Sequence, residues 1–185
     1  YWALMTFVPF PDLRPVDEGG KVISAELTVK DTAKLHWTTT NHLRGVFEPG
    51  LNLANYLDQK YLPGKKWDGT WDPEGLLSTL PAVATTLLGI FAGLLLRNPR
   101  LSEQRKVFWL LGAGLAGVVL GFLWGLQFPV IKKIWTSSYV LVAGGYSAVL
   151  LAVFHQTIEI WQRRKWAQVF IWVGANAITI YLLNN

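Results

Sequence analysis

Four long apolar runs fill the C-terminal part of this 185-residue sequence and limit what the chain can fold into. They cover residues 75–96, 107–126, 137–155 and 167–183. Each approaches the roughly 20 residues that an α-helix needs to cross a hydrocarbon core of about 30 Å. Because backbone polar groups must be satisfied internally in lipid, the sequence predicts an all-α fold, a polytopic transmembrane helical bundle of about four spans.

The N-terminal part divides into two segments. Residues 1–9 are apolar and end at a proline, so we expect the end of an earlier transmembrane span. Residues 10–74 hold most of the acidic side chains and many turn-forming residues, which predicts a long loop region. Within it, residues 20–29 alternate weakly like a strand, and residues 50–61 have the spacing of a short amphipathic helix. With no Met at the start and an apolar run at the end, we expect the C-terminal part of a larger bundle.

Basic residues between the runs predict the orientation. Arg and Lys outnumber acids in the gaps 97–106 and 156–166, which places both on the cytoplasmic side by the positive-inside rule. The region 10–74 then lies outside, together with Lys132 and Lys133, and a bacterial cytoplasmic membrane is expected. The net charge of +5 follows from these flanking cations, so the expected partner is the lipid bilayer and not nucleic acid.

Two local patterns concern helix starts and helix packing. Asp72 followed by Pro73 predicts the beginning of the first span, with Asp72 as the N-cap. Gly117, Gly121 and Gly125 repeat every four residues and therefore share one helix face. Such a ridge indicates close helix packing more strongly than a ligand groove.

Familiar soluble active sites are not visible. The chain has no cysteine, which excludes disulfides and thiolate metal sites. Its histidines, His36, His42 and His155, lack metal-binding spacing, so no metal is predicted. His155 ends the third run, where it can simply meet water, although polar groups at spans are often functional.

Polar side chains at the outer mouth of the bundle are the better candidates. Asp72 has a sufficient structural role as a helix cap, whereas Glu74 next to it does not. Asn176 lies within the fourth run, where an amide serves either function or interhelical hydrogen bonding. The further candidates on the amphipathic segment are Asn52, Asn55 and Asp58.

Five sequence blocks resemble one protein family. They are NLANYLD at 52–58, WDGTWDPEGLLSTLPA at 67–82, LGIFAG at 88–93, FPVIKKIWTSSYVL at 128–141 and GANAI at 174–178. Together they resemble the heparan-α-glucosaminide N-acetyltransferase-like membrane proteins, including bacterial members labelled as N-acetylglucosamine-related transporters. The resemblance covers roughly residues 46–183 and leaves 12–44 unmatched.

The resemblance implies an integral membrane acyltransferase. Such a protein transfers an acetyl group from acetyl-CoA to an amino sugar or envelope glycan across the membrane, with a catalytic histidine in a span upstream of this sequence. The blocks containing Asp72 to Gly75 and Trp135 to Tyr139 are expected pocket walls. Glu74 and Asp72 are the catalytic candidates, which either bind the amino-sugar cation or orient the upstream histidine.

Two other functions stay open at this point. The chain is alternatively a non-catalytic structural subunit of a larger membrane complex, or a sugar transporter that performs no acylation. Uptake of sugar without acetyl-CoA would identify a transporter, and co-migration with other proteins would identify a subunit. A homo-oligomer is compatible with each of them.

Overall fold

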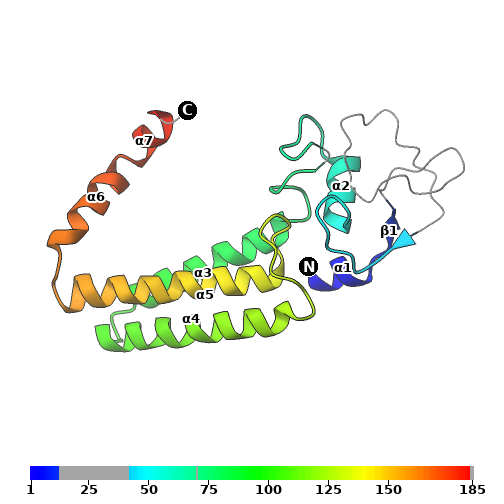
Figure 1. Cartoon of the computed structure of the whole chain (residues 1–185). Helices are drawn as coiled ribbons and strands as arrows, with labels where there is room; N and C mark the ends of the chain where they lie inside the picture. Colours follow the sequence, from blue (N-terminus) through cyan, green and yellow to red (C-terminus); the bar gives the residue numbers. More distant parts are fainter. Residues whose placement is uncertain (13–41, 70, 184–185) are drawn as a thin grey trace, which may run out of the picture.

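Three long helices form the central bundle. The computed structural model describes residues 1–12, 42–69 and 71–183. In it α3 (Thr79–Arg97), α4 (Glu103–Gly125) and α5 (Ser137–His155) lie side by side (Figure 1). Among the described residues, three helices are long and apolar enough to cross a membrane, the third being α5 continued to Ile160. The chain is therefore mostly helical, with an exposed apolar surface that suits lipid.

Glycines set the closest packing in the bundle, between α4 and α5. A Cβ placed on Gly121 would lie 2.6 Å from the Val142 side chain, and one on Gly145 would lie 2.6 Å from the Gly114 carbonyl oxygen. Gly117 faces α5 in the same way, so the prediction of close packing is confirmed there. Gly125 instead approaches Val130, in the connection after α4.

Short elements cover one end of this bundle. They are α1 (Trp2–Phe7), the antiparallel pair β1 (Phe10–Pro11) and β2 (His42–Leu43), and α2 (Leu53–Tyr61). α2 confirms the helix expected over residues 50–61. The strand expected over 20–29 lies outside the described residues.

A buried apolar cluster attaches these short elements to the bundle. Phe128 and Ile134, from the connection between α4 and α5, pack with side chains of α1, β1 and α2. We call this end, with residues 42–69, 71–78 and 126–139, the loop end. The opposite end, with residues 97–106 and 156–167, is the basic end.

The predicted start of the first span was wrong. α3 begins at Thr79, with Ser78 as the residue before it, and not at Asp72. The Asp72 carboxylate instead accepts backbone hydrogen bonds from Trp67, 3.0 Å away, and Glu74, 3.0 Å away. An aspartate that bonds nearby backbone in this way stabilises a turn in competition with a helix.

The fourth apolar run is divided. α6 (Gln168–Ala175) follows a short 3₁₀ turn, and α7 (Ala177–Leu183) begins after Asn176. Asn176 leaves helical geometry at φ −113°, and its amide donates to the Trp172 carbonyl, 2.8 Å away. The two helices lead away from the bundle (Figure 1). The single helix expected over 167–183 is therefore two short ones here.

The two basic gaps lie at the same end of the bundle. Glu103, which opens α4, contacts His155 at the end of α5, with 2.7 Å between the carboxylate and the imidazole Nε2. At the loop end, the Lys133 ammonium lies 2.7 Å from the Asp68 carboxylate. This arrangement agrees with the expectation that the gaps share a side, while the cytoplasmic assignment stays a prediction.

Candidate functional site

A buried carboxylate joins α2 to the turn before α3. Asp58 is 1% exposed, and its Oδ1 accepts a hydrogen bond of 2.8 Å from the Leu76 backbone N–H. Gly75 permits this approach, because a Cβ there would lie 2.0 Å from the Asp58 carboxylate. Burial raises the pKa of Asp58, and N–H groups of Leu76 and Asp72 oppose that shift.

Asn52 and Asn55 are buried at the start of α2. Asn52 caps the helix by accepting from the Asn55 N–H, and its own amide donates to the Glu48 carbonyl, 2.9 Å away, and to the Asn55 Oδ1. The Gly50 N–H also donates to Asn55 Oδ1, at 2.7 Å. The Asn55 Nδ2 is buried without a hydrogen-bond partner among the described residues. These amides thus support the loop end from inside.

Glu74, like Glu48, is an exposed acid of this region. Its side chain is exposed, and within residues 1–12, 42–69 and 71–183 its carboxylate makes no hydrogen bond or ion pair. Asp72 beside it is half-buried and committed to the turn. Lys133 lies over the ring of the buried Trp71, 5.4 Å from its centroid, while it pairs with Asp68.

Trp135 and Tyr139 form an aromatic pair at the start of α5. Their rings meet edge to face with 5.6 Å between centroids, and both side chains are half-buried. The Trp135 indole donates to the Thr85 hydroxyl of α3, 3.1 Å away. Trp135 has φ of 51°, a left-handed conformation that is strained for a bulky residue. The indole bond to α3 helps to hold this turn.

A buried hydroxyl pair, Thr136 and Ser138, lies next to these aromatic residues; both belong to the block expected as a pocket wall, but the sequence did not single out either one. Thr136 caps α5 by accepting from the Tyr139 N–H, and Ser138 donates to the Phe128 carbonyl, 2.6 Å away. The two hydroxyl oxygens are 3.1 Å apart. A Thr placed just before an apolar run was the available signal for the cap. The bond to residue 128 had no local signal.

The structure brings most of the sequence candidates to one end. Asn52, Asn55 and Asp58 lie there on α2 or at its start, next to the turn that carries Asp72 and Glu74. Trp135 and Tyr139 lie in the connection to α5 and at its start. Asn176 is separate, exposed between α6 and α7. In the part of the chain that is described, no cluster of three or more His, Asp or Glu side chains could hold a metal ion.

The exposed part of the loop end has a defined chemistry. A free carboxylate at Glu74 can pair with an ammonium group or accept a proton. The half-buried rings of Trp135 and Tyr139 at the same end offer apolar faces, and the two kinds of group suit polar ligands with apolar ring faces. The buried acids and amides beneath add rigidity and not further accessible ligands.

Comparisons with known proteins relate this chain to two proteins of the same name. Heparan-alpha-glucosaminide N-acetyltransferase from Homo sapiens is 27% identical over 124 residues, which cover 60% of this chain and 18% of that protein. The protein of the same name from Mus musculus is 26% identical over the same shares. The chain thus matches less than a fifth of the length of these relatives. No family model and no solved structure matches it. The chain is distantly related to the heparan-alpha-glucosaminide N-acetyltransferase family.

Proposed function

We propose that this chain is part of an integral membrane N-acetyltransferase that transfers an acetyl group from acetyl-CoA to an amino sugar or envelope glycan across a bacterial cytoplasmic membrane. The observation that carries the proposal is the similarity to two acetyltransferases, on a chain with three helices apolar enough for a bilayer. Residues 167–183 would supply a fourth span once neighbouring helices pack on α6 and α7. Residues 1–9 would end a preceding one.

The orientation places acceptor and donor at opposite ends. With the basic end in the cytoplasm, the loop end and Glu74 face outward, where an amino-sugar acceptor would arrive. Acetyl-CoA carries several phosphates, and exposed guanidinium groups suit them. Arg97, Arg100 and Arg105 at the basic end are the residues that would hold this group. When bound, it would supply the acetyl thioester; because the amine would lie at the other end, the upstream histidine that the resemblance implies would carry the acetyl group between them, with coenzyme A as the leaving group.

Glu74 has the central role in this proposal. An amino sugar is cationic until it loses a proton, so a free carboxylate at the mouth would attract it and help to remove that proton. Trp135 and Tyr139 would pack against the apolar face of the sugar ring. Asn52, Asn55 and Asp58 would act beneath them by keeping the turn that carries Glu74 in place. Asn176 would bind substrate only if α6 and α7 dock on the bundle.

The test is acetyl transfer by the full-length protein. We expect Glu74→Gln to lower the transfer of labelled acetyl from acetyl-CoA to glucosamine about tenfold, since a charge-assisted contact is lost. Glu48→Gln is the matched control, because Glu48 is an exposed acid at the same end whose side chain enters no role assigned above. The unmodified protein and the two variants should insert into the membrane to the same extent.

The outcomes separate the alternatives. Equal turnover in the Glu74 and Glu48 variants would remove Glu74 from the mechanism. Glucosamine uptake into vesicles without acetyl-CoA, and without acetylated product, would favour a transporter. Absence of both activities, with recovery on adding a co-purifying protein, would favour a subunit.

A further inference from the structure

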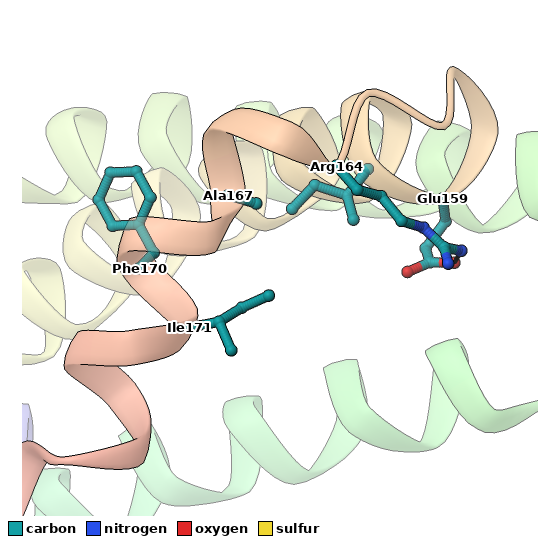
Figure 2. A pocket seen from close by; sticks show the side chains of 6 residues that line it. Glu159, Arg164, Ala167, Phe170 and Ile171 are labelled. Atoms are coloured by element: carbon teal, nitrogen blue, oxygen red, sulfur yellow. Dashed lines mark hydrogen bonds and ion pairs between the residues drawn. The ribbon is translucent and has the colours of Figure 1, made fainter.

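A hollow of about 480 Å³ lies at the basic end, where α5 passes into α6. One wall comes from the π-helical turn that extends α5, residues 156–160, and the other from α6 (Figure 2). Gln162, with φ of 55°, turns the chain back so that the two walls face each other. The lining residues are Ile158, Glu159, Arg164, Ala167, Phe170 and Ile171.

The polar side of the hollow is cationic. Arg164 is 59% exposed at its side chain and pairs with Glu159, which is 48% exposed, at 3.2 Å. Such an exposed ion pair contributes little to the stability of the fold. It leaves most of the five guanidinium donors free to bind another anion. Arg163 and Lys165 flank Arg164 in the sequence, so cations exceed the single carboxylate here. A phosphate group is the anion that a guanidinium fork matches best.

The other side of the hollow is apolar and continuous with the surface of α6. Phe170 and Ile171 are largely exposed, and Figure 2 shows both side chains beside the hollow, with Arg164 and Glu159 at its other end. Trp161 and Trp166 lie before and after the three cations, and Trp166 packs edge to face on Phe170. Tryptophan next to cations at the end of an apolar helix is typical of the headgroup level of a bilayer.

We propose that this hollow binds one anionic phospholipid. The lipid phosphate contacts Arg164, with Arg163 and Lys165 providing further positive charge, and an acyl chain lies along Phe170 and Ile171. Charge complementarity selects an anionic lipid over a zwitterionic one, and the tryptophans place the site at the depth where phosphates lie. The bound lipid then fills the space between the end of α5 and the start of α6. This site does not depend on the proposed acetyl transfer.

The experiment measures lipid binding to the full-length protein in detergent by native mass spectrometry. The probes are dioleoyl phosphatidylglycerol and dioleoyl phosphatidylcholine. We expect phosphatidylglycerol to bind about fivefold more tightly, as expected for one cation at a membrane surface. Arg164→Gln should abolish this preference, and Arg164→Lys should keep part of it. Lys132→Gln, at an exposed cation outside the hollow with no role assigned above, should leave it unchanged.

Further arms distinguish the source of the phosphate. Phe170→Ala should weaken both lipids about equally, because it removes chain contacts and not charge. Inorganic phosphate or coenzyme A should displace phosphatidylglycerol only at much higher concentrations. Equal binding of the two lipids, equal losses in the Arg164 and Lys132 variants, or efficient displacement by coenzyme A would each overturn the lipid site. Circular dichroism of each variant checks that the helices are retained.

Discussion

The two ends of the bundle use polar side chains in opposite ways. At the loop end, Asn52, Asp58 and Ser138 are nearly inaccessible, and each is bonded to backbone from another turn or segment. At the basic end, the acids Glu103 and Glu159 are about half exposed; Glu159 pairs with the exposed Arg164, whereas Glu103 pairs with the more buried Lys106 and His155. These polar groups of the loop end are therefore interior, whereas each of these ion pairs at the basic end keeps an exposed acid.

This difference separates polar groups that stabilise the fold from polar groups that remain free to bind a ligand. A buried polar group that loses its partner costs about 1–3 kcal/mol, because its desolvation is no longer offset. An exposed ion pair typically contributes less than about 1 kcal/mol and exchanges readily with water or ligands. Substitutions at the loop end should therefore destabilise the fold, and substitutions at the basic end should mainly change binding. Three predictions test this contrast, in decreasing order of effect.

Gly75→Ala should have the largest effect. The new Cβ would overlap the Asp58 carboxylate, which lies 2.0 Å away from that position, so the bond to the Leu76 N–H must break. We expect a loss of about 2 kcal/mol in the free energy of unfolding, measured by reversible denaturation in mixed micelles. Gly93→Ala is the control, because nothing lies within 4 Å of a Cβ at that position.

A double mutant shows whether Asp58 is the cause. In an Asp58→Ala background the carboxylate is absent, so Gly75→Ala should destabilise the protein much less than in the original chain. Equal effects in the two backgrounds would mean that the backbone conformation at residue 75, and not the carboxylate, requires glycine.

Asp58 should also make the stability of the fold depend on pH, an effect of intermediate size. Burial is the largest cause of its raised pKa, so the folded state binds this proton more tightly than the unfolded state. The resulting stabilisation is fully present below the ordinary pKa of aspartate and is lost as pH rises through the raised folded-state value. We expect the melting temperature of the protein, relative to Asp58→Asn, to fall as the pH rises above about 4, the ordinary pKa of aspartate. A difference that grows with pH would show that the backbone bonds outweigh burial.

Glu159→Gln should have the smallest effect on stability. The pair with Arg164 is half exposed and screened by salt, so we expect a change below about 0.5 kcal/mol in the free energy of unfolding. The same substitution removes the carboxylate that competes for Arg164, so phosphatidylglycerol binding should strengthen. A loss of 2 kcal/mol or more, comparable to that of Gly75→Ala, would contradict the contrast between the ends.

The sequence predicted a helix end correctly where the local residues were compatible with one structure only. The bounds of α5, Ser137–His155, agree with the predicted run because Thr136 caps its start and an apolar stretch follows. The start of α3 was predicted too early, with Asp72 in place of Ser78 as the N-cap, because Asp72 satisfies a helix cap and a tight turn equally well. The break at Asn176 lacked a signal, because a single amide inside an apolar run is also common in continuous helices.

The candidate site was less accessible to prediction. The sequence indicated that acids and amides gather before the first span. The structure adds that the Asp58 carboxylate packs against Gly75, which explains why residue 75 is a glycine. The sequence did not distinguish the buried side chains from the exposed Glu74, because buried and exposed polar residues occur in the same short segments. Thr85 was missed as a partner of Trp135, since those residues are 50 positions apart.

What the sequence determined by itself is the membrane character of the chain. Hydropathy, span length and flanking charge act along the chain, so three of the apolar runs became helices close to their predicted places. Only the tertiary structure decided which polar groups meet: Asp58 with Leu76, Lys133 with Asp68, and Glu103 with His155. The physical reason is that burial and hydrogen bonding depend on chain segments 18 to 65 residues apart, whose approach the packing of the helices sets.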